Sequence, residues 1–344
     1  MDMFSLIKDL CQKEGVSGDE RFFSVYAEKL LKNYCTNTWI DKLGNVFGLI
    51  PSKEKNAKRF MIEAHLDRIG LIVKRVDENG FIEFERVGGV DERILPAAEV
   101  TVLGKKNIFG VIGAKPPHLR FDGDKNKAPS AKDMLIDVGM TKKEAEKYIK
   151  TGDMILLCGE PERLLNNRVC AAALDNRAGM AAVFALLKKT KGKELPYDLY
   201  ICFSVGEESG LLGAGPASFA VAPDICAVVD VTFGKLYSED KTPGTFALGG
   251  GAVIFRGPDV CYDGCLNLIE KARENNLPFN IEVSGKSSGT NAFAIQSSAG
   301  GSYLFLISIP IKYMHQTVET VCLDDISSAG DLLYLLVSGG VKIA

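Results

Sequence analysis

Apolar residues recur along the chain at two different spacings, and the spacing separates helices from strands. Residues 2–14 and 19–34 keep their apolar positions on one helical face, which predicts two amphipathic helices. Continuous apolar runs predict strands at 45–50, 59–67 and 70–76. From residue 158 onward, strand and helix patterns alternate, with strands at 197–205, 225–232 and 302–310 and helices at 178–190, 262–275 and 324–338. This alternation predicts an α/β fold in which helices cover both faces of a sheet.

The segment between residues 70 and 157 has a different pattern. Short β-rich runs alternate there with Gly and Pro turns, and the runs are 81–87, 99–104 and 107–114. Such spacing is typical of a small barrel. We therefore expect one α/β domain formed by residues 1–69 and 158–344, and an inserted β-barrel-like domain formed by residues 70–157.

Side chains near two of the predicted helix starts are suited to capping. Ser17 is followed three residues later by Glu20, which predicts a capping box before the helix at 19–34. A short helix is also predicted at 141–150, with Thr141 as its N-cap.

Composition and charge exclude several classes of partner. The 344 residues are 46% hydrophobic and carry a net charge of -3, so there is no basic footprint for nucleic acid or for an anionic membrane. No apolar run reaches the roughly 20 residues of a membrane span. The first residues carry acids and amphipathic spacing where a signal peptide has a basic head and an apolar block. We therefore expect a cytoplasmic protein.

Two of the three histidines lie near carboxylates at the ends of apolar runs. His65 follows the segment MIEA, and Asp67 points to the same side of an extended chain. A carboxylate beside an imidazole fixes its tautomer and increases its basicity. His315 follows another predicted strand. Each histidine also fits a purely structural role, because most lone histidines are not ligands.

Four further acids lie at or inside apolar stretches. Asp175 precedes a predicted helix, where it also fits an ordinary N-cap. Glu207 and Glu208 end a predicted buried strand; they fit a surface loop, or one binds a cation and the other moves protons. Asp230 lies within an apolar run and needs a partner, which is a metal, an arginine or backbone amides.

All of these segments fall at or near strand ends of the predicted sheet. Functional side chains of α/β sheets gather at the carboxyl ends of the strands. The joint set of imidazoles and carboxylates suits two divalent ions with nitrogen and oxygen ligands. Zinc or cobalt fits that set better than magnesium or calcium.

The segments AHLD, ALDNR, GEESGLLGA, VD and YMH, in this order, resemble the tetrahedral (TET) dinuclear metallo-aminopeptidases. Members of that family are also called glutamyl aminopeptidase, deblocking aminopeptidase or endoglucanase M. The similarity covers nearly the whole chain and includes VSGDE, GVIGAKPPHL, LIDVGM and SGTNAFAIQ. It implies a zinc-peptidase-like fold and an enzyme that removes N-terminal residues from short peptides with a free N-terminus.

The resemblance also implies how two metal ions are bound in each subunit. His65 and Asp230 hold one ion, and Glu208 and His315 hold the other. Asp175 bridges the two ions. The resemblance further implies a cis peptide bond between Asp175 and the residue that follows it.

Roles in the chemistry follow from the same resemblance. Glu207 is implied as the general base, with a hydroxide between the metals as the nucleophile, and Asp67 is implied to orient His65. Thr290 and Asn291 are expected in the substrate-binding region. The family commonly has GTDA where this chain has Asn291, so a negative charge is expected to be lost there.

The assembly implied by the resemblance is a hollow particle of twelve subunits. The inserted domain is expected to serve self-association and to act as a lid. The third histidine, His118, lies in that domain, and we expect a structural role for it.

Other functions fit parts of the pattern. A carboxypeptidase or amidohydrolase can use the same dinuclear core. A glycoside hydrolase can use paired carboxylates but does not require the two histidines. A non-catalytic metal-binding protein does not need Glu207, which the implied ligand set leaves unused.

Overall fold

The computed structural model describes residues 2–116, 130–237, 242 and 244–342. His118 lies outside the described residues.

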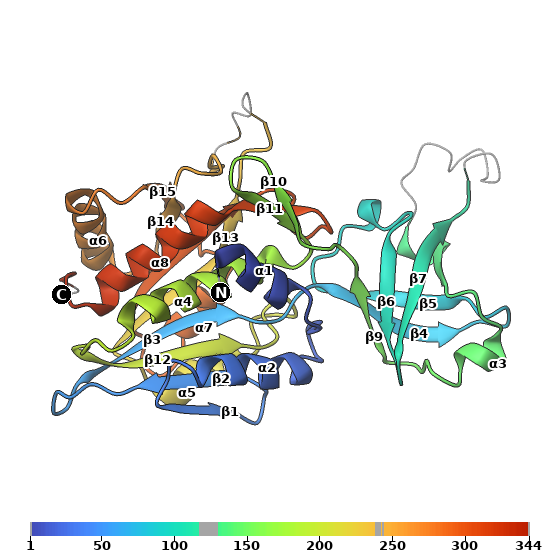
Figure 1. Ribbon diagram of the computed structural model, residues 1–344, viewed down its shortest axis with the longest axis horizontal. Coiled ribbons are helices and arrows are strands. Elements are labelled where there is room, and N and C mark those ends of the chain that lie inside the picture. Colours follow the sequence, from blue (N-terminus) through green and yellow to red (C-terminus); the bar gives the residue numbers. More distant parts are fainter. Residues whose placement is uncertain (1, 117–129, 238–241, 243, 343–344) are drawn as a thin grey trace.

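A mixed sheet of eight strands forms the larger part of the molecule (Figure 1). In spatial order its strands are β1 (Asn37–Ile40), β2 (Val46–Ile50), β12 (Tyr197–Ser204), β3 (Lys58–His65), β13 (Ile225–Phe233), β16 (Tyr303–Ile311), β14 (Ala252–Arg256) and β15 (Phe279–Val283).

The four central strands of this sheet, β12, β3, β13 and β16, run parallel. Strand β13 is buried along nearly its whole length, which explains its uninterrupted apolar sequence. Because the four strands are parallel, their carboxyl ends meet at one edge of the sheet.

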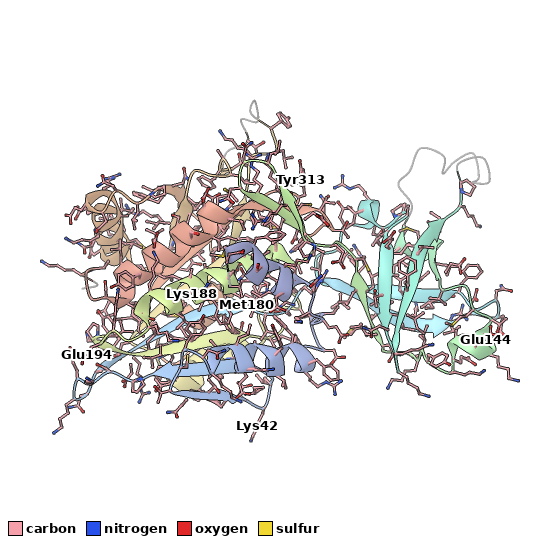
Figure 2. The ribbon with its side chains drawn as sticks, viewed as in Figure 1. Lys42, Glu144, Met180, Lys188, Glu194 and Tyr313 are labelled. Carbon is pink, nitrogen blue, oxygen red and sulfur yellow. The ribbon has the colours of Figure 1, made fainter. Side chains whose placement is uncertain are left out.

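Helices pack on both faces of the sheet. One face carries α1 (Met3–Cys11), α2 (Arg21–Leu31), α4 (Leu174–Thr190), α6 (Tyr262–Glu274) and α8 (Leu323–Val337). The other face carries α5 (Ala214–Val221) and α7 (Asn291–Gln296). Met180 on α4 is fully buried in the core, whereas Lys42 and Glu194 extend into solvent at the periphery (Figure 2). The predicted α/β fold with helices on both faces is confirmed.

A closed barrel lies to one side of the sheet (Figure 1). Its strands, in the order in which they pair, are β4 (Gly70–Val76), β5 (Ile82–Val87), β8 (Met134–Asp137), β7 (Asn107–Ala114), β6 (Glu99–Leu103) and β9 (Met154–Leu157). Alternate residues of each strand face inward and form a core separate from that of the sheet. The short helix α3 (Lys142–Ala145) packs nearby and begins after Thr141, which is its N-cap as predicted.

A small three-stranded sheet lies between these two bodies and contains β10 (Glu162–Leu164), β11 (Arg168–Ala171) and β17 (Glu319–Cys322). Its middle strand β11 leads directly into α4, and β17 leads directly into α8. Two single-turn 3-10 helices cover residues Glu92–Ile94 and Ala131–Asp133.

The capping box predicted at Ser17 and Glu20 is wrong. Helix α2 begins at Arg21, and Glu20 makes no side-chain cap hydrogen bond. The Ser17 hydroxyl lies 2.7 Å from the hydroxyl of Ser209, and Glu20 accepts a hydrogen bond from the backbone of Gly206. Both side chains therefore fix the loop after β12, a tertiary contact that the local sequence does not reveal.

None of the helices within the described ranges combines the length and the apolar character that crossing a bilayer requires.

Candidate metal centre

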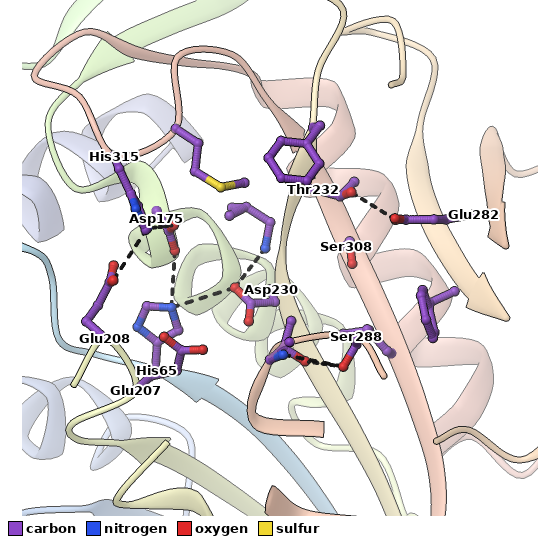
Figure 3. Close-up of a pocket in the computed structure, with 17 residues that line it drawn as sticks. His65, Asp175, Glu207, Glu208, Asp230, Thr232, Glu282, Ser288, Ser308 and His315 are labelled. Carbon is purple, nitrogen blue, oxygen red and sulfur yellow. Dashed lines mark hydrogen bonds and ion pairs between the residues drawn. The ribbon is translucent and has the colours of Figure 1, made fainter. Parts of the chain in front are cut away.

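The candidate ligands converge at the carboxyl edge of the parallel strands (Figure 3). His65 is the last residue of β3, and Glu207 and Glu208 follow the end of β12. Asp230 lies near the end of β13, and His315 lies beyond the end of β16. The fold thus brings together residues that lie up to 250 positions apart in the sequence.

Asp175 enters this edge from the start of α4, where its φ and ψ are not helical. The peptide bond between Asp175 and Asn176 is cis, as the resemblance implied. The Asn176 side chain accepts from the backbone of Gly179 at 3.0 Å and donates to the backbone oxygen of Val229 at 2.8 Å. Asn176 thereby ties the start of the helix to strand β13.

The two carboxylate oxygens of Asp175 face different histidines. Its Oδ1 lies 3.1 Å from Nε2 of His65, and its Oδ2 lies 3.4 Å from Nε2 of His315. One carboxylate therefore stands between two imidazoles, which is the disposition of a ligand shared by two cations.

Each imidazole has further carboxylates beside it. Nε2 of His65 lies 3.6 Å from Oδ1 of Asp230, and Nε2 of His315 lies 3.4 Å from Oε2 of Glu208. The ligand atoms fall into two groups, each within 4.8 Å, formed by His65, Glu207 and Asp230 and by Asp175, Glu208 and His315. Two imidazoles and four carboxylates are a donor set that suits divalent cations with borderline character, such as zinc.

Asp67 holds two parts of the centre in place. Its carboxylate accepts hydrogen bonds from the backbone amides of Glu207 at 3.1 Å and of Glu208 at 3.0 Å. Its Oδ1 also lies 3.4 Å from Nδ1 of His65, while the backbone oxygen of Asp67 lies 3.2 Å from the same atom. Asp67 is fully buried, so protein groups rather than solvent satisfy its carboxylate.

Glu319 plays a similar part on the other side, and the sequence analysis did not identify it. Its carboxylate accepts from the backbone amides of Asp175 at 3.1 Å and of His315 at 2.7 Å. Glu319 is the first residue of β17 and is buried. The sequence signal that could have indicated Glu319 is an acid within the run QTVETVC, because an acid that is buried there needs a polar partner.

The excess of acids changes the proton affinities of the cluster. Burial raises the pKa of Glu207 to about 9, and neighbouring carboxylates add to the effect. Hydrogen bonds to Asp175 and Glu208 raise the pKa of His315 to about 11. Burial acts to raise the pKa of Asp175, but hydrogen bonds with both histidines outweigh it and hold this pKa below its usual value. The cluster is therefore strongly attractive to positive charge.

A cavity of about 240 Å³ opens beside the ligands. Besides the metal-ligand candidates, its wall contains Thr290, Ser308 and, further from the histidines, Thr232 and Glu282 (Figure 3). The sequence analysis did not find Glu282, which lies in the edge strand β15.

The two residues expected in the substrate region have different surroundings. Thr290 lines the cavity and caps α7. Asn291 is buried outside the cavity wall, where its amide donates to Glu63 at 2.8 Å and to Ser204 at 3.0 Å. Asn291 therefore does not line the cavity.

The fold and this convergent cluster together define a metal-dependent peptide hydrolase. A model of the M42 glutamyl aminopeptidase family matches residues 44–332, and the chain belongs to this family. The lysyl aminopeptidase of Pyrococcus furiosus is 32% identical over 330 residues, which are 94% of each chain.

Solved structures agree with this assignment. The aminopeptidase APDkam598 of the archaeon Desulfurococcus kamchatkensis superposes with a TM-score of 0.91 at 30% identity, covering 98% of this chain and 95% of the other. The TET1 peptidase of Pyrococcus horikoshii superposes with a TM-score of 0.85 at 29% identity, covering 98% and 100%. The chain is accordingly a metallo-aminopeptidase, and the resemblance to the TET enzymes is confirmed.

Proposed function

We propose that this aminopeptidase removes the first residue of short peptides with two divalent ions bound at the centre described above. The observation that carries the proposal is the placement of Asp175, whose two oxygens face His65 and His315 separately. We assign His65 and Asp230 to one ion, Glu208 and His315 to the other, and Asp175 to both.

The donor set supports zinc or cobalt as the bound ions. Imidazole nitrogen and carboxylate oxygen are ligands that both metals accept, whereas calcium and magnesium favour all-oxygen sites. When bound, such a pair of ions polarises the scissile carbonyl and lowers the pKa of a water molecule toward neutrality.

Glu207 is the residue we assign as general base. It lines the cavity, and the backbone hydrogen bond to Asp67 fixes its position next to His65 and Asp230. Its carboxylate accepts the proton of the attacking water and returns it to the departing amine. Burial raises the pKa of Glu207 to about 9 in the absence of cations, and cations bound beside it would lower this pKa so that the carboxylate can accept a proton.

Asp67 and Glu319 act in this proposal as positioning residues. Asp67 fixes the backbone of both Glu207 and Glu208 and orients His65. Glu319 fixes the backbone of Asp175 and His315. The two buried acids thus hold the ligands at the distances that two-metal chemistry requires.

Residues 70–157 are proposed as an inserted domain that serves self-association. The TET1 peptidase of Pyrococcus horikoshii forms a dodecamer, a tetrahedron or a large octahedral shell. On the barrel of this chain, Phe109 and Val111 of β7 expose apolar surface. We propose burial of this surface in a homododecamer, whose closed shape would admit only short, unfolded peptides past the inserted domain as a lid.

A cytoplasmic location is proposed as well. The cysteines of the described part of the chain form no disulfide, in keeping with a reducing compartment.

One experiment separates the candidate activities. The purified protein is stripped with EDTA and reloaded with zinc or cobalt. It is then assayed on aminoacyl chromogenic substrates, on the same substrates with an acetylated N-terminus, and on peptides with a blocked C-terminus. The proposal expects metal-dependent cleavage that needs a free N-terminus and tolerates a blocked C-terminus. Cleavage that needs a free C-terminus would instead identify a carboxypeptidase, and activity on blocked substrates an amidohydrolase.

A further inference from the structure

The cavity beside the metal centre continues away from the ligands and ends at an acid that the proposed chemistry does not use. Glu282 lies at this far part of the wall, with its carboxylate directed toward Thr232 (Figure 3). The Thr232 hydroxyl donates to Oε2 of Glu282 at 2.8 Å. Only one of the carboxylate oxygens is used in this bond, so the other remains available to a ligand.

Thr232 connects the metal end of the cavity with Glu282. Thr232 and Asp230 are two residues apart on β13, so their side chains point to the same face of the sheet. Their α-carbons are separated by roughly 6.6 Å, twice the rise per residue of a strand. Glu282 lies beyond Thr232 and is hydrogen-bonded to its hydroxyl group.

The wall between the two ends combines apolar and hydroxyl-bearing residues. Phe255 pairs in register with Glu282, and Phe233, Leu306 and Met314 add apolar surface, while Ser288, Thr290 and Ser308 contribute hydroxyl groups. An aliphatic stem fits such a wall, while its charged tip needs a polar partner at the end.

Apart from the two histidines, the ionisable side chains of the cavity wall are all acidic. The wall contains the carboxylates of Asp175, Glu207, Glu208, Asp230 and Glu282. Among the described residues of this wall none is a lysine or an arginine, and both histidines stand at the metal end. Once metals neutralise the ligand carboxylates, Glu282 is the carboxylate left to set the charge of the far end.

We propose that Glu282 is a specificity-determining residue that selects peptides with a basic N-terminal residue, lysine above all. The inference rests on the proposed function, because it places the first residue of the peptide with its carbonyl at the metals and its side chain in this cavity. The four-carbon stem of lysine lies along the apolar residues of the wall, and its ammonium reaches Glu282. An acidic first residue meets like charge there and is disfavoured.

The test compares catalytic efficiency on lysyl, leucyl and glutamyl p-nitroanilides for the wild type and for Glu282→Gln. The Gln variant keeps the shape of the side chain and an oxygen for Thr232 but removes the charge. We expect the wild type to prefer lysyl over leucyl. We expect Glu282→Gln to lower kcat/KM for lysyl substrate by about 10- to 100-fold, the value of a charged hydrogen bond, and for leucyl substrate by less than about threefold.

Two further variants sharpen the test. Glu282→Lys should reverse the preference and raise activity on the glutamyl substrate. Glu270→Gln removes the same charge from the exposed face of α6 and should leave all three efficiencies unchanged. An equal loss on lysyl and leucyl substrates in Glu282→Gln, or no lysyl preference in the wild type, would overturn the assignment.

Binding provides a readout that does not depend on turnover. Calorimetry compares L-lysine with L-norleucine, which has the same stem without the ammonium. The inference expects tighter binding of lysine, and loss of that difference in Glu282→Gln. If no substrate is cleaved, the proposed function fails while this difference still supports Glu282 as the cation site. Equal binding of the two amino acids by the wild type sinks the role of Glu282 and leaves the peptidase chemistry unaffected.

Discussion

The backbone of Gly89 lies directly against the imidazole of His315. Its carbonyl oxygen is 3.2 Å from Nδ1, and a Cβ at this position would lie 2.7 Å from the same nitrogen. Gly89 belongs to the loop after barrel strand β5, so the barrel helps to orient a proposed metal ligand in the loop that follows β16.

Substitution of Gly89 by alanine tests this contact. The added methyl group has no room beside His315, so the imidazole must move. We expect Gly89→Ala to weaken binding of one metal and to lower kcat/KM by about 10- to 100-fold, the scale of a small displacement in an active site. Metal titration and kinetics on one substrate measure the two effects.

The matched control is Gly113→Ala in strand β7 of the same barrel. A Cβ at Gly113 meets only the backbone oxygen of Leu135 at 3.9 Å, which is ordinary contact. This variant should behave as the wild type. Normal activity in Gly89→Ala would show that His315 does not depend on the barrel for its position.

Replacement of Glu207 by glutamine separates metal binding from proton transfer. The amide cannot accept the proton of the attacking water, while the remaining ligands still hold the metals. We expect full metal occupancy with kcat lowered by at least about 100-fold, the scale of a lost general base. Elemental analysis and steady-state kinetics provide the measurements.

The exposed Glu162 of strand β10 offers a control for Glu207→Gln, since Glu162→Gln makes the same change away from the cavity. Near-normal turnover in Glu207→Gln would remove Glu207 from its assigned role. Loss of metal in that variant would instead make it a ligand, as its grouping with His65 and Asp230 also allows.

Truncation of Asp175 tests whether one side chain serves both ions. Because its two oxygens face different imidazoles, we expect Asp175→Ala to lose both metals and all measurable activity. Elemental analysis after dialysis shows the number of ions retained. Asp263→Ala, at an exposed position in the first turn of α6, should retain both ions. Retention of two ions by Asp175→Ala would contradict the shared ligand.

The stability of the metal-free protein should fall as the pH rises. The pKa of Glu207 is raised from 4.5 to about 9 and that of His315 from 6.5 to about 11. A raised pKa in the folded protein means tighter proton binding there. Its stabilisation is complete below the unfolded pKa and is lost as the pH rises through the folded pKa. Glu207 therefore lowers the stability between pH 4.5 and about 9 and His315 between pH 6.5 and about 11, and the two effects add between pH 6.5 and about 9.

Thermal unfolding of chelated and zinc-loaded protein at pH 6 and pH 9 checks this expectation. Tm of the chelated form should fall between the two values, and Tm of the loaded form should fall less because the metals replace the protons. Chelated Glu207→Gln should show a weaker pH dependence, since the titration of Glu207 is gone. A chelated Tm that rises with pH would contradict the sign of both shifts.

Local patterns indicated which side chains gather in one cluster because the main signals lie at strand ends. His65 and Glu208 each follow a buried apolar strand, and parallel strands bring such ends together whatever their exact order. The bridging place of Asp175 came from the family resemblance, since its local sequence equally suits an N-cap. The side-chain roles themselves remain predictions.

Residues whose importance depends on distant partners could not be found in this way. Glu319 contacts the backbone of Asp175 from 144 positions away, and Glu282 meets Thr232 from 50 positions away. Barrel strands β8 and β9 span four residues each, too short for a periodic signal to stand out. Ser17 misled the capping prediction because its partner Ser209 is far along the chain.

Glu282 lies on β15, the strand that ends the eight-stranded sheet, whereas His65 and Asp230 lie on central strands. An edge strand has neighbours on one side only, so a new side chain there disturbs little of the surrounding packing. If Glu282 selects the substrate as proposed, a single substitution at the margin of the fold can change the preference, while the proposed metal ligands lie on the buried central strands.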